Sequence, residues 1–168
     1  MLKFSIITSC FNSEEYIAET IESVVQQTAL IQNNCELEYI IIDGNSTDRT
    51  NSIIENYKKL YPNIIHKIED DNGLYDGLSK GFPLVTGDIM GYLNAGDFLS
   101  KTAFSTLSNI FLNDEVNWVT GLKVLYNHNS EVIDVQVPYL YRPSLIRAGA
   151  YGKNLPFIQQ ESTFWRPK

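Results

Sequence analysis

The chain has 168 residues, a length that suits one domain with its own hydrophobic core. Hydrophobic residues make up 43% and charged residues 20%, and the formal net charge is −7 without a basic run. A surface of this sign repels a phosphate backbone, which argues against nucleic acid as a partner. A phosphate-bearing ligand that carries its own divalent cation stays compatible with this charge.

Four short apolar runs in the first hundred residues predict strands, at residues 4–9, 38–42, 64–68 and 88–93. Apolar residues at helical spacing fill the segments between the first three runs. Because strands alternate with helices, the pattern predicts an α/β fold with a mostly parallel central sheet flanked by helices. Such sheets bind ligands at the carboxyl ends of their strands.

Three helices are predicted around these strands. The first begins with the capping-box pair Asn12 and Glu15. The second is expected to be capped by Ser46 or Thr47 and to stop before the next proline. The third, over residues 74–85, contains two glycines and a proline, so we expect it to be short or kinked.

The remaining residues are predicted to form a smaller region. A helix is expected over residues 101–112, and a hairpin over residues 118–126 and 131–137. Residues 138–156 are rich in Pro, Gly and Tyr and are predicted to be a loop. Residues 159–165 are apolar again. No repeat or second domain is indicated, so a single domain over the whole chain is expected.

The two cysteines and the first residues indicate the compartment. Cys10 and Cys35 fit neither a disulfide framework nor a zinc site, so two unpaired thiols in a reducing compartment are expected. The start lacks the apolar stretch of a signal peptide, and no apolar run reaches the ~20 residues of a transmembrane helix. We therefore expect a cytoplasmic protein, with peripheral contact at the inner face of the membrane left open.

Carboxylate or amide side chains follow each of the four predicted strands. Asn12 follows the first strand, Asp43 the second, Asp71 the third, and Asn94 and Asp97 the fourth. Since the carboxyl ends of parallel strands meet at one edge, these side chains are expected to share one ligand. Asp97 can coordinate a hard cation through oxygen. Asp43 can accept a hydrogen bond from a nucleotide base, although an aspartate in a turn is equally a turn former.

Five segments show a motif order that extends beyond these single residues. They read Phe-Ser-Ile-Ile-Thr-Ser-Cys-Phe-Asn at residues 4–12, Ile-Ile-Asp-Gly-Asn-Ser-Thr-Asp-Arg-Thr at 41–50, Asp-Asn-Gly-Leu-Tyr-Asp-Gly-Leu-Ser-Lys-Gly at 71–81, Tyr-Leu-Asn-Ala-Gly-Asp at 92–97, and Gln-Gln-Glu-Ser-Thr-Phe-Trp-Arg at 159–166. In order and spacing they resemble the family 2 nucleotide-sugar glycosyltransferases. The resemblance implies the Rossmann-like GT-A fold, with a carboxyl-terminal hairpin and acceptor region.

The resemblance implies a role for each matching position. The donor nucleotide-sugar would be bound by Ser9, Phe11, Asn12, Asp43, Asp71, Asp76, Lys80 and Asn94. Asp97 would hold Mg²⁺ or Mn²⁺, and Glu161 would be the general base that takes the proton of an acceptor hydroxyl. The donor would be a nucleotide-diphosphate sugar, with a UDP-sugar favoured, and the acceptor a saccharide or a lipid-linked saccharide. The transfer would invert the anomeric carbon and serve cell-surface polysaccharide synthesis.

The chain departs from the family pattern at several positions. Asn94 and Gly96 replace two aspartates of the usual metal motif, and Gly44 replaces the second aspartate of the nucleotide motif. Metal dependence is therefore expected, but in a weakened form. The match implies that residues 1–100 bind the donor and residues 101–168 the acceptor. The chain stops where family members usually continue, which indicates a trimmed catalytic core or an unusually small acceptor side.

These departures leave a second hypothesis open, a catalytically degenerate module that binds a nucleotide-sugar or a partner enzyme. A signalling receiver domain and a nucleotidylyltransferase fit the motifs less well. Single residues keep structural alternatives too. Glu161 is equally a surface carboxylate or a helix cap, and Lys80 equally a solvated helix residue. Asp71 and Asp76 are equally charges that favour a helix amino terminus.

Overall fold

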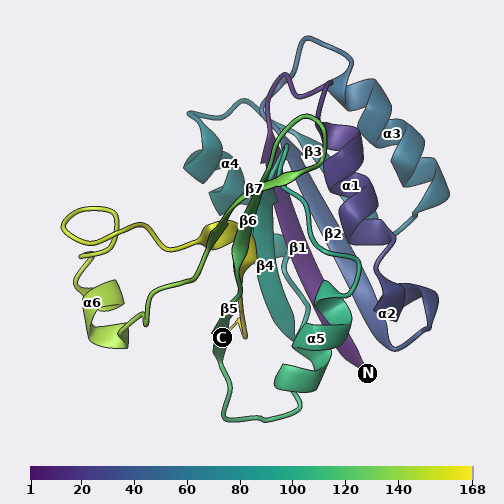
Figure 1. The fold of residues 1–168 in the computed structure, drawn as a ribbon. Helices are drawn as coiled ribbons and strands as arrows, with labels where there is room; N and C mark the ends of the chain where they lie inside the picture. The colour runs from purple at the N-terminus through teal and green to yellow at the C-terminus, as the bar shows by residue number, and fades with distance from the viewer. Residues whose placement is uncertain (168) are drawn as a thin grey trace.

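A six-stranded sheet forms the centre of the computed structural model, which describes residues 1–167 (Figure 1). Its strand order is β3-β2-β1-β4-β8-β5. The strands are β1 (Leu2–Cys10), β2 (Cys35–Asp43), β3 (Ile64–Ile68), β4 (Ile89–Asn94), β5 (Trp118–Thr120) and β8 (Thr163–Trp165). The strands β1 to β4 are parallel, and β8 runs antiparallel to both β4 and β5. The predicted α/β fold with a mostly parallel sheet is confirmed.

Helices cover both faces of this sheet (Figure 1). They are α1 (Ile17–Val25), α2 (Thr28–Ile31), α3 (Thr50–Leu60), α4 (Leu74–Gly81) and α5 (Ala103–Ile110), with the 3₁₀ turn η1 (Phe82–Leu84). Helix α6 (Pro143–Arg147) lies apart from the sheet in Figure 1, and a second 3₁₀ turn, η2 (Gln160–Ser162), precedes β8. Side chains of α1, α2, α3 and α5 share one buried cluster, and α4 contributes to a second. The third predicted helix is thus short, as expected, and a 3₁₀ turn follows it. None of the helices in residues 1–167 is long and apolar enough to span a membrane.

The core explains why the central strands read as continuous apolar runs. In β1 and β2, Ile6 and Ile41 belong to the cluster under α1, α3 and α5. The neighbouring Ile7, Ile40 and Ile42 belong to the cluster under α4. All five side chains are fully buried, because both faces of a parallel sheet are covered. Both cysteines are buried and free, as predicted.

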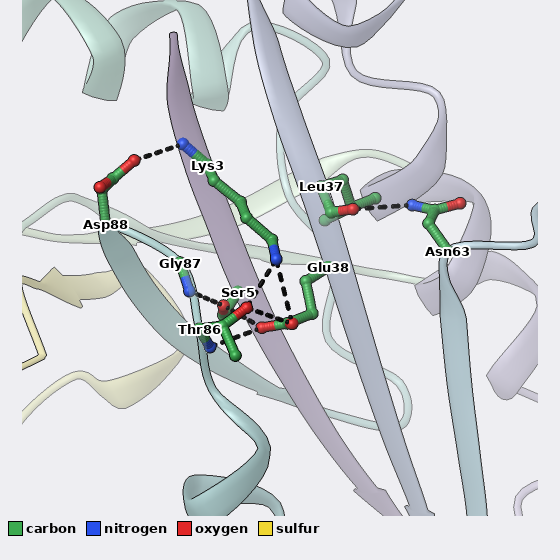
Figure 2. A network of polar contacts seen from close by, with 8 residues as sticks. All are labelled: Lys3, Ser5, Leu37, Glu38, Asn63, Thr86, Gly87 and Asp88. Carbon is green, nitrogen blue, oxygen red and sulfur yellow. Dashed lines mark hydrogen bonds and ion pairs between the residues drawn. The ribbon is translucent and has the colours of Figure 1, made fainter.

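A polar network closes the amino-terminal end of the sheet (Figure 2). The buried carboxylate of Glu38 on β2 accepts hydrogen bonds from Ser5 Oγ (2.6 Å), Thr86 N (2.8 Å) and Thr86 Oγ1 (2.7 Å). It also pairs with Lys3 Nζ at 3.2 Å. Burial opposes ionisation of Glu38, but the hydrogen bonds outweigh it and hold its pKa below the usual value. The network therefore ties β1, β2 and the start of β4 together.

The predicted helix caps are wrong. Helix α1 begins at Ile17, beyond the capping box, and its amino-terminal cap makes no side-chain hydrogen bond. Asn12 instead has a φ of 46°, its N–H donates to Ser46 Oγ (2.8 Å), and its side-chain oxygen accepts from Thr47 N (2.9 Å). Ser46 and Thr47 likewise do not cap α3, which begins after Arg49. The polar residues expected to cap two helices join two loops to each other.

The predicted hairpin exists but is shorter. It consists of β6 (Lys123–Tyr126) and β7 (Val132–Gln136), which form a separate two-stranded sheet. The residues just before it, β5, pair with β8 and so belong to the main sheet. The predicted loop at 138–156 also contains α6. Residue 168, the end of the domain expected from the sequence, lies outside the described residues.

Candidate active site

A cleft of about 420 Å³ opens at the carboxyl ends of β1 and β4. The strand order reverses here, since β2 and β3 lie on one side of β1 and β4 lies on the other. Open α/β sheets bind ligands at such a switch point. Four of the eight predicted donor-binding residues line the cleft, namely Ser9, Phe11, Asp71 and Asn94. Ser9 and Asn94 lie opposite each other in the β1–β4 register, and the Phe11 side chain is 58% exposed.

Two glycines allow the Asp71 carboxylate to lie in the wall of the cleft. A Cβ atom on Gly44 would lie 2.7 Å from Asp71 Oδ2, and one on Gly77 would lie 3.0 Å from it. A Cβ on Gly77 would also come within 2.3 Å of Ser9 Oγ, so α4 packs directly on the end of β1. Asp71 Oδ1 accepts a hydrogen bond from Gly73 N at 2.9 Å. The replacement of the second motif aspartate by Gly44 therefore makes room for a different carboxylate.

Asp43 and Asn12 lie at the same edge but do not line the cleft. Asp43 is fully buried, and its Oδ1 accepts from Ser46 N at 2.6 Å. The Cys10 thiol lies 3.6 Å from Asp43 Oδ2, and burial together with this carboxylate raises the pKa of Cys10. The Asp43 carboxylate thus holds the turn after β2, while Asn12 holds the loop after β1. Both residues therefore hold loops next to the cleft without lining it.

Asp76 and Lys80 on α4 also lie outside the cleft. Asp76 Oδ2 accepts from Asn72 N at 3.0 Å and lies 3.7 Å from Lys80 Nζ. The hydrogen bond from Asn72 and the charge of Lys80 lower the pKa of Asp76. Lys80 also donates to the backbone oxygen of Asp70. These contacts hold the loop that leads from β3 into α4, which contributes Asp71 to the cleft wall.

Asp97 and Glu161 are the remaining residues of the predicted site, and neither of them lines the cleft. Asp97 follows β4, and its N–H donates to the backbone oxygen of Asn94 at 3.0 Å. Burial raises the pKa of Asp97, and the negative charge of Glu161 raises it further. Hydrogen bonds from Asn94 and the charge of Lys123 act in the opposite direction. Two residues far apart in the sequence are therefore close enough to interact electrostatically.

Glu161 reaches this position because η2 leads into β8, which lies beside β4. Gly91 on β4 is opposite Phe164 on β8, and a Cβ on Gly91 would lie 2.6 Å from the Phe164 ring. The Tyr92 hydroxyl donates to Gln160 Oε1 at 2.7 Å, and burial raises the pKa of Tyr92 to about 12. Lys123 Nζ lies 3.2 Å from Glu161 Oε1. The sequence analysis missed Lys123, which reads as an ordinary strand residue, and assigned no role to Tyr92, although Tyr92 begins the motif segment at residues 92–97.

The residues around Asp97 offer few metal ligands, namely one carboxylate and one amide oxygen. Among residues 1–167, no three His, Cys, Asp or Glu side chains come together as a metal site. The side-chain oxygen of Asn94, however, is buried without a hydrogen-bond partner and belongs to a cleft-lining residue next to Asp97. One carboxylate and one amide oxygen fit a cation that also takes ligands from phosphate and water.

A sequence model of glycosyl transferase family 2 matches residues 5–163. The chain belongs to this family. The resemblance expected from the five motif segments is therefore confirmed, and the match includes both parts of the site.

Two similar proteins are named for teichoic acid biosynthesis and for transfer of N-acetylglucosamine to poly(ribitol-phosphate). The minor teichoic acid biosynthesis protein GgaA of Bacillus subtilis is 34% identical over 131 residues, which cover 76% of this chain and 29% of GgaA. The poly(ribitol-phosphate) β-N-acetylglucosaminyltransferase TarS of Staphylococcus aureus is 29% identical over 103 residues, 60% of this chain and 17% of TarS. The chain thus spans well under half the length of these curated relatives.

Solved structures of family members share the fold. TarS residues 1–349 from S. aureus match with a TM-score of 0.68 at 20% identity, over 98% of this chain and 47% of that one. The mannosyltransferase PcManGT of Pyrobaculum calidifontis, in complex with GDP-Man and Mn²⁺, matches with a TM-score of 0.61 at 18% identity. That match covers 74% of this chain and 35% of PcManGT. The predicted GT-A fold is confirmed.

Proposed function

We propose that this chain is the catalytic part of a glycosyltransferase that moves a sugar from a nucleotide-diphosphate donor to an acceptor hydroxyl. The observation that carries the proposal is the position of the cleft, at the switch point of the sheet and lined by Asn94, to whose backbone oxygen the Asp97 N–H is bonded. A UDP-sugar is the favoured donor, because TarS 1–349 has been solved with UDP-GlcNAc. The names of GgaA and TarS favour cell-wall or cell-surface polymer synthesis as the pathway.

The donor would lie in the cleft with its base at Phe11. The exposed Phe11 ring offers a face for stacking, and the Asp71 carboxylate can accept hydrogen bonds from the base or ribose. The loops around the donor would be held in place by contacts of four further residues, Asn12, Asp43, Asp76 and Lys80. Asp97 and the free oxygen of Asn94 would hold Mg²⁺ or Mn²⁺, which would stabilise the charge of the departing diphosphate.

Glu161 would act as the general base on the acceptor side. Its carboxylate takes the proton of the acceptor hydroxyl while that oxygen attacks the anomeric carbon. The bond from this carbon to the diphosphate breaks, and its electron pair leaves with the diphosphate. Attack from the face opposite the leaving group inverts the anomeric carbon. The acceptor is a saccharide or a lipid-linked saccharide, and the site of action is the inner face of the cell membrane.

The thin metal site favours a second candidate function. Only one carboxylate adjoins Asn94 in the metal motif, and no cluster of three acidic or His or Cys ligands occurs within residues 1–167. A degenerate family member with this motif would bind the nucleotide-sugar, or a partner enzyme, without turnover. Turnover by the full-length protein separates the two functions.

The test combines nucleotide binding with turnover. We expect UDP with Mn²⁺ to raise the melting temperature more than UDP alone or other nucleoside diphosphates, since a ligand that binds only the folded state stabilises it. Glu161→Gln should then lower turnover by at least ~100-fold, the usual contribution of a general base, and leave donor affinity within about two-fold. Glu115→Gln, a change at an exposed carboxylate away from the cleft, is the matched control. Equal losses of turnover and affinity would make Glu161 structural, and donor binding without turnover would favour the degenerate module.

A further inference from the structure

An ion pair joins the hairpin to the proposed base. Lys123, the first residue of β6, places its Nζ 3.2 Å from Glu161 Oε1, although the geometry is not that of a hydrogen bond. The Lys123 side chain is 34% exposed and the Glu161 side chain is 19% exposed, so the ion pair is only partly accessible to water. Lys123 does not line the donor cleft. Its contact is therefore with the acceptor side of the site.

The backbone fixes Lys123 beside Glu161. The β5–β8 ladder pairs Thr120 with Thr163, and Gly121 continues it by donating its N–H to the Ser162 oxygen at 2.8 Å. The Ser162 hydroxyl in turn donates to the Gly121 oxygen at 3.1 Å. The residue just before the hairpin is thus bonded to the segment that carries Glu161 through both the N–H and the carbonyl oxygen of Gly121.

The other end of β6 is anchored next to the metal motif. The Tyr126 ring lies 5.4 Å from the Phe98 ring, centroid to centroid, and Phe98 directly follows Asp97. Strand β6 thus contacts the site at both ends, through Lys123 and through Tyr126. This arrangement restricts the ways in which the Lys123 side chain can move away from Glu161.

We propose that Lys123 is a positioning residue for the transfer reaction, holding Oε1 of Glu161 so that Oε2 receives the proton of the acceptor hydroxyl. This inference rests on the proposed function. The proton moves from the acceptor hydroxyl to Glu161, the acceptor oxygen bonds to the anomeric carbon, and the diphosphate leaves with the electron pair of the broken bond. Lys123 itself exchanges no proton in this step. Its effect is confined to the orientation of the base.

The test is a kinetic comparison of Lys123 variants in the full-length protein. Lys123→Met should lower kcat by about 10- to 100-fold, the usual cost of a misplaced catalytic group, with the donor KM within about two-fold of wild type. Lys123→Arg should recover most of kcat, because a guanidinium can make the same ion pair. Lys123→Gln, which keeps the polarity and removes the charge, covers the case in which the Met variant fails to fold. Lys153→Met, the same substitution at an exposed lysine outside the Lys123–Glu161 ion pair, is the matched control.

The outcomes separate this inference from the proposed function. If wild type transfers sugar and Lys123→Met or Lys123→Gln keeps full kcat, the inference is wrong and the proposed function stands. The inference is likewise wrong, and the proposed function stands, if Lys123→Arg does not recover the lost kcat. It is also wrong if the donor KM rises as much as kcat falls. If wild type binds the donor and never turns it over, the proposed function and this inference are both wrong.

Discussion

Asp97 joins the two parts of the candidate site, because it adjoins the cleft through Asn94 and the base through its electrostatic contact with Glu161. Its pKa is raised, so its ionised form is disfavoured in the folded protein without a cation. A residue in that condition contributes little to folding stability.

We expect Asp97→Asn to remove the part of UDP affinity that depends on Mn²⁺, a loss of about ten-fold or more, since the only carboxylate of the proposed metal set is gone. The melting temperature of the free protein should not fall. Titration calorimetry of UDP with and without Mn²⁺ measures the effect. Asp114→Asn, at a fully exposed side chain, is the control. An unchanged gain from Mn²⁺ in the Asp97 variant would remove Asp97 from the metal site.

Some site residues follow from the sequence and others do not. Asp71 and Asn94 were predictable because the ends of parallel strands share one edge, whereas Ser9 and Phe11 followed only from the family resemblance. The burial of Asp43 was not predictable. It depends on the turn after β2, in which the backbone N–H of Ser46 donates to the Asp43 carboxylate. Lys123 was not predictable either. Its contact depends on a ladder between two strands of three residues that have no periodic pattern of their own.

At the scale of elements, the amino-terminal end of the sheet depends on one carboxylate. Glu38 on β2 holds β1 through Ser5 and holds the segment before β4 through Thr86 (Figure 2). The three strands that meet at the cleft are thus fastened to one another at their opposite ends.

We expect Glu38→Gln to lower the free energy of unfolding by about 2 kcal/mol, the cost of weakening hydrogen bonds to a buried charged group. Because the pKa of Glu38 is lowered in the folded state, its contribution is complete above its unfolded pKa and is lost as the pH falls through its folded pKa. The difference between wild type and variant should therefore be full at pH 7 and shrink in acid. Urea unfolding at several pH values measures it, with Glu36→Gln at an exposed site of the same strand as control. A difference that does not change with pH would contradict this account.

The elements themselves were predictable to different degrees. The strands β1, β2 and β4 have apolar runs because both of their faces are largely buried, β3 is only partly buried, and all four strands were predicted close to their places. The partition of residues 118–126 between β5 and the hairpin was missed. Gly121 is the point at which the chain leaves the main sheet, and a glycine within an apolar run marks either a bulge or an exit. The start of α1 was misplaced because loop contacts took the side chains that were expected to cap it.

At the scale of the whole molecule, burial is uneven. The buried core lies in the first 111 residues and in β8, and no residue from 121 to 160 is buried. The hairpin, α6 and the segments around them therefore have few apolar contacts that oppose local opening. The proposed donor side of the molecule is a packed sheet, and the proposed acceptor side consists mainly of exposed segments.

We expect limited chymotrypsin digestion to cut first between residues 121 and 160, where Tyr139, Leu140 and Phe157 are exposed. A fragment that contains residues 1–111 should persist, because opening it requires disruption of the core. Intact-mass spectrometry of a digestion time course identifies the first cut. The exposed Tyr16 and Tyr75 in the first half serve as internal controls. A first cut at either of them would contradict the uneven stability.

The insertion of β8 between β4 and β5 has a consequence for how the protein is made. A ribosome delivers β4 and β5 well before residues 163–165 emerge, and until then β5 has no neighbour in the sheet. When β5 has been synthesised, the residues that line the cleft have all been synthesised too, whereas Glu161, the proposed base, has not. The proposed donor site thus precedes the proposed base in synthesis, and β8 is the last strand of the central sheet to be added.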